Sequence, residues 1–115
     1  MRKDQRGGRV NRVNSLIRQL VDQEFIRSSD PILNSLTIAH VDTSPDMKRS
    51  TVFVLAMDKK RSDVLDSLFK NRVRIQKNIG KQLDMKFTPK LSFELDPIAD
   101  NAEKLNNIFN TIGNE

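Results

Sequence analysis

Apolar residues recur at every third or fourth position in the first quarter of the chain. The members of this stripe are Val10, Val13, Leu16, Ile17, Leu20, Val21 and Phe25. Such spacing is typical of one face of an amphipathic helix and predicts a helix over residues 9–27. Pro31 closes the segment, because the residue before a proline is disfavoured in the helical region. Residues 1–8 are largely polar and contain two adjacent glycines, so we expect a flexible basic arm before the helix.

The next segment has the shorter period of β-strands. Residues 36–41 alternate between apolar and polar positions and place His40 on the apolar side. Residues 51–57 are apolar on both faces, as expected for a central strand. The residues between them, 43–49, are rich in turn formers. The pattern therefore predicts an antiparallel hairpin with a moderately long loop.

Helical spacing returns after the second strand. Ser62 is a suitable N-cap for a helix that carries Asp63 in its first turn. A second helical stretch, over residues 73–84, repeats an apolar residue at every fourth position. Residues 71–73 are weak helix formers and separate the two stretches. The segment is therefore either one kinked helix or two helices.

A last strand and a last helix complete the pattern. Residues 91–96 alternate between apolar and polar positions, and residues 100–112 combine a capping box with an apolar stripe that ends at Gly113. The order is helix, strand, strand, helix, helix, strand, helix. It predicts a single α+β domain over residues 9–113, built as a two-layer sandwich with the helices on one face of the sheet.

Composition narrows the class of protein. A chain of 115 residues has room for one hydrophobic core. It has no cysteine, which excludes a disulfide framework and a thiolate metal site. No apolar run approaches the roughly 20 residues that span a bilayer. The basic N-terminus is not followed by the apolar segment of a signal peptide. We therefore expect a cytoplasmic protein with no membrane partner.

The distribution of charge is more informative than the net charge of +5. Residues 1–12 hold five basic side chains and one acidic one, and residues 70–91 hold seven basic side chains and one acidic one. The last segment, residues 92–115, is acidic. Two basic blocks in a chain with a pI of about 9.8 indicate a polyanionic partner.

The strongest candidate site is a cationic stripe in the second basic block. On a helical wheel, Ile75, Ile79 and Leu83 share one side, and four cations fall within a sector of about 60° on the opposite side. These cations are Lys70, Arg74, Lys77 and Lys81. Like charges at this spacing repel each other, so folding gains nothing from the arrangement. A merely solvated outer face is the alternative explanation, and we favour a face that binds nucleic acid.

Other cations extend the candidate site. Arg72 lies at the predicted kink, and Lys86 flanks Phe87, a phenylalanine that fits no core stripe. Arg6 and Arg9 belong to the N-terminal block, which is either a polyelectrolyte arm or a solubilising tail. The full set of candidate RNA-binding residues is Lys70, Arg72, Arg74, Lys77, Lys81, Lys86, Arg6 and Arg9.

The sequence offers little for catalysis. We interpret His40, the single histidine, as a partly buried side chain with its ring hydrogen-bonded. No glycine-rich phosphate loop occurs. Four phenylalanines fit core stripes, so base stacking on the sheet is not expected. They are Phe53, Phe69, Phe93 and Phe109. We therefore expect no enzyme activity, no metal and no cofactor.

Several short motifs follow one another in order along nearly the whole chain. They are Arg9-Val10, Asp30-Pro31, Val41-x-x-Ser44-x-Asp46-Met47 leading into Val52-x-Val54, then Ile75, Gly80-Lys81 and Pro89-x-Leu91-x-Phe93-x-x-Asp96. Together they resemble the ribosome-binding factor A family of bacterial assembly factors. The resemblance implies a type II KH-like fold without the GxxG loop of ordinary KH domains. It also implies an Ala-x-Gly kink between the middle helices, where this chain has Asn-Arg-Val at residues 71–73.

The resemblance also implies a function. It suggests a monomeric factor that binds the immature small (30S) ribosomal subunit and its 16S rRNA and assists late maturation, notably in the cold. The alternative is a protein–protein adaptor that uses the sheet edge and the acidic C-terminal helix. A DNA-binding domain has less support, because no short glycine-containing turn joins two helices in the manner of a helix-turn-helix.

Overall fold

The computed structural model describes residues 2–56 and 59–96 of the chain. Its elements in chain order are α1 (Arg2–Arg27), α2 (Pro31–Asn34), β1 (Thr37–Thr43), β2 (Arg49–Leu55), α3 (Arg61–Gln82) and β3 (Lys90–Leu95). The three predicted strands are all present, each within two residues of its expected position. The helix expected over residues 100–112 lies outside the described residues. The structure confirms the predicted α+β class.

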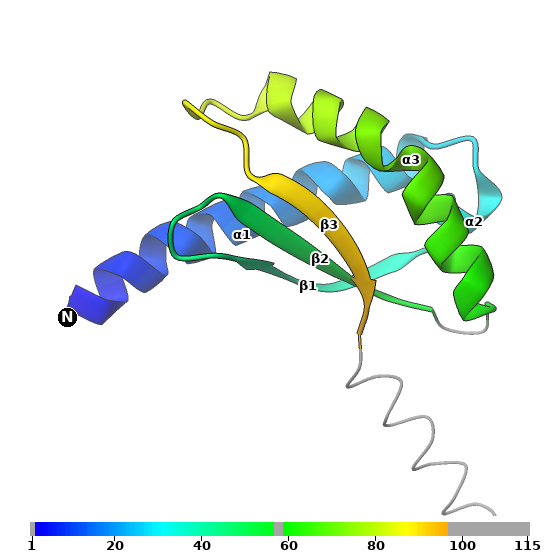
Figure 1. Ribbon diagram of the computed structural model, residues 1–115, viewed down its shortest axis with the longest axis horizontal. Coiled ribbons are helices and arrows are strands. Elements are labelled where there is room, and N and C mark those ends of the chain that lie inside the picture. The colour runs from blue at the N-terminus through cyan, green and yellow to red at the C-terminus, as the bar shows by residue number, and fades with distance from the viewer. Residues whose placement is uncertain (1, 57–58, 97–115) are drawn as a thin grey trace, which may run out of the picture.

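The sheet has the strand order β1-β2-β3, with β2 in the centre. β1 and β2 pair antiparallel, which confirms the predicted hairpin. β2 and β3 pair parallel, with Arg49 opposite Lys90 and Val54 opposite Leu95. Parallel neighbours need a crossover connection, and α3 supplies it by running back over the sheet between the two strands (Figure 1).

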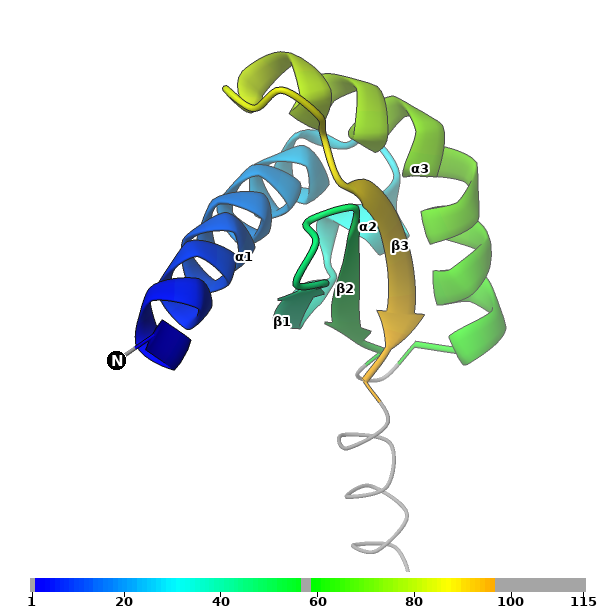
Figure 2. The same ribbon diagram turned by 60° about the vertical axis from the view of Figure 1, so that its left-hand side comes forward.

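The helices form the second layer on one face of the sheet (Figure 2). α1 packs mainly on β1, and α3 packs mainly on β3. Along β2, Ser50, Val52 and Val54 are buried under the helices, whereas Thr51 and Phe53 on the opposite face are half-buried. This alternation is the pattern of a sheet covered on one side.

The core lies between the sheet and the two long helices. Its largest fully buried side chains are Phe25, Ile17, Leu33, Leu68, Ile75, Ile79 and Leu91. Each such side chain stabilises the fold by about 1.5–3 kcal/mol relative to an exposed one. The predicted α1 stripe is confirmed as core at Val13, Ile17, Leu20, Val21 and Phe25, whereas Val10 is half-buried and Leu16 is exposed. The stripe of the second half of α3 is confirmed as core.

The first helix begins earlier than expected. α1 starts at Arg2, so the predicted start at residue 9 is wrong. Glycine costs about 1 kcal/mol relative to alanine inside a helix, which is why Gly7-Gly8 suggested a boundary. Extending an existing helix avoids the cost of nucleation, however, and the arginine, lysine and glutamine residues before the glycines are good helix formers. The flexibility predicted for residues 1–8 stays a prediction.

A short helix that the sequence analysis did not predict follows α1. The Asp30 carboxylate caps α2 by accepting hydrogen bonds from the backbone N–H groups of Ile32 (2.9 Å) and Leu33 (3.5 Å). Pro31 occupies the first helical position, where its fixed φ angle suits the helix and a missing N–H costs nothing. The Asp-Pro pair therefore ends one helix and also begins the next.

The middle of the chain forms one helix rather than two. α3 is continuous from Arg61 to Gln82 and bends visibly along its length, so the single bent helix is the correct alternative (Figure 1). Its N-cap is Lys60, with an extended backbone and no side-chain cap bond, so the predicted Ser62 cap is wrong. At the predicted kink, the Asn71 amide donates to the Ser67 carbonyl oxygen one turn earlier, at 2.8 Å.

Three side chains lie elsewhere than expected, and one of them is Phe53, which was predicted for the core but is half-buried on the open face of the sheet. A bulge in β1 shifts the register between Ile38 and His40, so His40 turns to the open face of the sheet while Val41 turns inward. The His40 ring is exposed and stacks on Phe53, with 4.4 Å between ring centroids. The prediction of a partly buried histidine is therefore wrong. Phe69 is also not a core residue, because 74% of it is exposed.

Candidate nucleic-acid interface

The predicted cationic stripe lies on the outer surface of α3. Its four residues, Lys70, Arg74, Lys77 and Lys81, are all exposed. Ile75 and Ile79, on the opposite side of the helix, are fully buried. The structure thus confirms that the helix presents these cations to solvent, and their contact with nucleic acid stays a prediction. We call these four residues the α3 cationic face.

Few interactions within the protein engage this face. The Lys70 ammonium lies 3.4 Å from the Asp66 carboxylate, and both side chains are about two-thirds exposed. Such a surface pair stabilises the protein by roughly 0–1 kcal/mol and breaks readily. The Arg74 guanidinium donates to the Asn71 side-chain oxygen at 2.8 Å. Among the described residues, Lys77 and Lys81 have no ion-pair partner, so both are available to a ligand.

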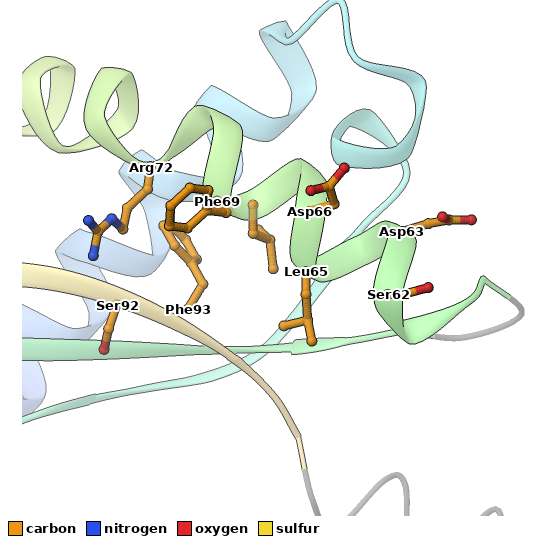
Figure 3. A pocket seen from close by; sticks show the side chains of 9 residues that line it. Ser62, Asp63, Leu65, Asp66, Phe69, Arg72, Ser92 and Phe93 are labelled. Atoms are coloured by element: carbon orange, nitrogen blue, oxygen red, sulfur yellow. The ribbon is translucent and has the colours of Figure 1, made fainter.

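Arg72 lies on a different side of α3. Its guanidinium is half-buried and lies over the Phe69 ring, 5.9 Å from the ring centroid. Both side chains line a cleft of about 640 Å³ between the first half of α3 and β3, together with Leu65, Ser92 and Phe93 (Figure 3). The lining also includes Ser62, Asp63 and Asp66, so Arg72 belongs to a cleft of mixed polar and apolar character rather than to the α3 cationic face.

The N-terminal cations form a separate region. Arg9 is exposed on α1, and Arg6 belongs to the same helix, although its side chain lies outside the described part of the chain. In both ribbon views the first turns of α1 lie far from the C-terminal end of α3 and from the loop that follows it, which carries Lys86 (Figures 1 and 2).

Partly buried polar contacts hold α3 in place, and they were not predicted from the sequence. The second oxygen of the Asp30 carboxylate accepts from the Ser67 hydroxyl at 2.6 Å, and the Asn71 amide lies 3.5 Å away. The hydrogen bond from Ser67 is the main cause that lowers the pKa of Asp30, and the two α2 backbone N–H groups add to it. The Asp-Pro pair was visible in the sequence as a cap signal, but its long-range partner Ser67 was not.

A second contact fixes the far half of α3. The Gln76 side chain donates to the Pro89 carbonyl at 3.0 Å and accepts from the Leu91 backbone N–H at 2.7 Å. It thereby joins the helix to the start of β3. The Asn78 amide also donates to the buried Glu24 carboxylate of α1 at 3.3 Å. The cations of α3 are therefore displayed on a helix with fixed orientation, which lowers the entropic cost of binding a ligand.

The described residues offer no sign of a metal centre. Within residues 2–56 and 59–96, no group of three histidine, cysteine, aspartate or glutamate side chains is placed to hold a metal ion. None of the helices in the same part of the chain is both long and apolar enough to cross a membrane.

The fold first defines a class: the protein is an α+β protein of KH-like architecture with a long basic helix at its surface. The sequence profile of ribosome-binding factor A matches residues 9–109. The chain is 38% identical to the ribosome-binding factor A of Ruegeria sp. (strain TM1040) over 104 residues, which cover 86% of this chain and 79% of that relative. The chain therefore belongs to the ribosome-binding factor A family, which confirms the resemblance seen in the sequence.

Solved structures support the fold assignment. The crystal structure of ribosome-binding factor A from Thermus thermophilus has a TM-score of 0.68 at 22% identity and covers 75% of this chain and 93% of its own. Homology-based coordinates of the Thermus thermophilus protein, fitted into a cryo-EM map of its complex with the 30S subunit, have a TM-score of 0.60 at 23% identity. They cover 70% of this chain and 88% of their own.

Proposed function

We propose that this protein binds the small (30S) ribosomal subunit and its 16S rRNA through the α3 cationic face and assists late maturation of the immature subunit. It acts without catalysis, as a cytoplasmic monomer, and its contribution matters most in the cold. Membership of the ribosome-binding factor A family supports the choice of partner. A relative of the same fold is seen in a complex with the 30S subunit.

One observation carries the choice of surface. The α3 cationic face gathers four cations on the side of the helix opposite its buried stripe, and only Lys70 forms an ion pair among the described residues. Repulsion along such a face opposes helix formation by a few tenths of a kcal/mol per pair. A phosphate backbone removes this repulsion, because each bound cation neutralises a phosphate and releases condensed counterions.

Sedimentation tests the proposal. We expect the wild-type protein to co-sediment with free small subunits or their precursors at low salt, and not with translating ribosomes. We expect the triple variant Arg74→Gln, Lys77→Gln and Lys81→Gln to stay at the top of the gradient. The matched control Arg27→Gln, Lys59→Gln and Lys60→Gln removes the same charge outside the face and should sediment like the wild type. Absence of wild-type protein from the subunit fractions at low salt contradicts the proposal.

The cleft beside β3 favours a second candidate, a protein–protein adaptor. Phe69 and Val73 are 74% and 71% exposed, and they lie on the side of α3 near β3, which is an edge strand of the sheet formed by the described residues. Exposed apolar side chains beside a free strand edge are typical of peptide-binding surfaces. Salt separates the two candidates, because binding to RNA weakens steeply with rising salt whereas an apolar interface barely responds. Salt-insensitive co-sedimentation that is lost in Phe69→Ser would favour the adaptor.

A further inference from the structure

Two loops meet beyond the C-terminal end of α3. One joins β1 to β2 and the other joins α3 to β3, and both lie at the same end of the molecule (Figure 1). The Lys90 backbone N–H donates to the Lys48 carbonyl at 2.9 Å and ties the loops together. Between them lies a hollow of about 510 Å³. Its lining residues are Asp46, Met47, Lys48, Met85, Lys86, Phe87 and Thr88.

The hollow combines an apolar floor with a free aromatic ring. Met47 and Met85 are half-buried against the core. Phe87 is 75% exposed, and the Lys86 ammonium lies 5.6 Å from its ring centroid. A lone exposed phenylalanine needs no explanation. An exposed ring beside an apolar hollow and a cation has the components of a site that stacks a flat, electron-rich ligand.

The backbone of the β1–β2 loop is held in an unfavourable conformation at this hollow. Met47 has a φ of 61°, which costs a β-carbon-bearing residue free energy and favours glycine or asparagine. Its backbone N–H donates to the Ser44 carbonyl at 2.8 Å. The Asp46 carboxylate accepts from the Ser44 hydroxyl at 2.6 Å and from the Lys48 backbone N–H at 3.0 Å. These bonds fix the loop backbone around Met47, whose side chain lines the hollow.

The surroundings of the hollow are positive. Lys48 and Lys86 line it, and Arg49 and Lys90 are exposed at the paired strand ends beside it. The hydrogen bonds that Asp46 accepts keep the pKa of this carboxyl low, so it stays ionised but is directed into its own loop. The lining of the hollow itself holds two cations, Lys48 and Lys86, against one acidic group, Asp46, so the hollow complements an anionic ligand.

The hollow also lies next to the α3 cationic face. The α3–β3 loop packs closely on the last turns of the helix, because a β-carbon placed on Gly80 would lie 3.3 Å from the Thr88 hydroxyl oxygen. Gly80 immediately precedes Lys81, the last cation of the face. The loop that carries Phe87 therefore lies against the end of the helix that carries the face.

We infer that Phe87 stacks an unpaired nucleobase of single-stranded RNA, while Lys48 and Lys86 contact the flanking phosphates. The inference rests on the proposed RNA-binding function and adds the kind of RNA recognised. A base within a duplex offers no free face to a side chain, whereas an unpaired base can leave the strand and stack on an aromatic ring. Every base has such a face, so the site selects unpaired nucleotides rather than one sequence.

A single tryptophan gives a direct test. The chain contains no Trp or Tyr, so the variant Phe87→Trp carries one fluorophore, at the proposed site. We expect a mixed-sequence single-stranded RNA decamer to quench its fluorescence and the same sequence as a duplex to leave it largely unchanged. Equal quenching by both RNAs, or quenching by neither, would overturn the inference.

Affinity measurements on two further variants provide a second test. We expect Phe87→Ala to weaken binding of the labelled decamer by roughly 5- to 150-fold, with duplex binding and the salt dependence unchanged. Phe87→Leu keeps apolar bulk without an aromatic face, so it should lose affinity nearly as strongly as Phe87→Ala. Because the ring is exposed, both variants should keep the wild-type melting temperature. If the Phe87→Leu variant bound the decamer with the affinity of the wild type, the stacking inference would be overturned, and the contact would be only apolar.

The outcomes separate this inference from the proposed function. If Phe87→Ala binds the decamer and small subunits like the wild type while the α3 triple variant does not, only the stacking site fails. If the wild type binds neither RNA nor subunits, both fail. If Phe87→Ala loses subunit binding but keeps its affinity for the decamer, the hollow binds protein, and the inference is wrong.

Discussion

At the scale of single residues, Asp30 connects more of the fold than any neighbour in its loop. One of its oxygens caps α2, and the other accepts from Ser67 in the middle of α3. Removal of the side chain leaves the first N–H groups of α2 without a partner and also leaves the Ser67 hydroxyl, on a buried residue, without its acceptor. The residue therefore stabilises a local cap and a tertiary contact together.

We predict that Asp30→Ala lowers the free energy of unfolding at pH 7 by about 0.5–2 kcal/mol, the usual range for loss of a cap. Because hydrogen bonds lower the pKa of Asp30 below its ordinary value of 3.8 in the folded state, its contribution as a charged group is present above that pH. It is lost as the pH falls through the folded-state pKa. Urea denaturation of both proteins across the acid range measures the difference.

The variant Asp30→Asn is the control for charge. It keeps an oxygen acceptor for the cap but cannot ionise, so its stability relative to Asp30→Ala should not change over the acid range. A wild-type advantage that stays constant below the ordinary pKa of aspartate would contradict the assigned pKa shift.

Residue-level errors in the sequence analysis have a common physical origin. His40 shares an alternating pattern with Ile38, but the bulge between them adds one residue and reverses the side on which His40 lies. Phe69 follows the buried Leu68 in α3, and its own side of the helix faces the cleft and solvent. Periodicity along one element identifies an apolar side chain, but contacts from distant elements decide whether that side chain is covered.

At the scale of elements, α3 has an inner side that packs in the core and an outer side that is exposed to solvent. Its inner side is fixed by the core, so Ile75, Ile79 and the four-residue spacing were predictable from sequence. Its outer side is free of packing constraints, so the shared sign of its cations was also visible from sequence. The Gln76 bonds to the start of β3 were not predictable, because they depend on the crossover that brings the strand alongside.

We predict that the variant with Gln at positions 74, 77 and 81 reduces the salt dependence of RNA binding. If each cation pairs with one phosphate, the slope of log K against log salt should shrink by roughly two to three. Glutamine keeps helix propensity, and removal of like-charge repulsion should leave the melting temperature unchanged or slightly higher. Fluorescence anisotropy over a salt series, with thermal unfolding as the check on folding, measures both quantities.

If the triple variant folds and keeps the wild-type affinity and the wild-type slope of log K against log salt, the α3 cationic face is exposed to solvent but does not bind RNA. The candidate contacts would then move to the first turns of α1 or to the hollow at Phe87. The control variant at Arg27, Lys59 and Lys60 should lose less of the slope than the triple variant, because those cations lie outside the face.

At the scale of the whole molecule, two basic regions lie on different helices. The first turns of α1 carry the N-terminal block, and the end of α3 carries the second block with its adjoining loop (Figure 2). The separate blocks were apparent in the sequence, and so were the two layers and the family. How the two regions lie relative to each other could not be predicted from the sequence, because it depends on how the helices pack on the sheet.

We predict that deletion of residues 1–8 weakens RNA binding modestly and leaves the fold intact. The first described core residue of α1 is Val13, so the deletion removes cations but no buried side chain of the described part. Thermal unfolding should change little, and the loss of affinity should be smaller than that of the α3 triple variant. A large fall in melting temperature would show that the first turns of α1 pack against the rest of the protein.

The parallel pairing of β2 with β3 has a consequence for how the chain acquires its structure. The β1–β2 hairpin and α1 consist of contacts close in sequence, which form early because little loop entropy opposes them. Arg49, however, meets Lys90 only after the whole of α3 has crossed the sheet. Leu91, buried at the end of this crossover, closes the core from the last described strand. We expect a nascent chain from which β3 has not yet emerged to have a hairpin and helices but no closed core, so that cooperative folding waits for β3.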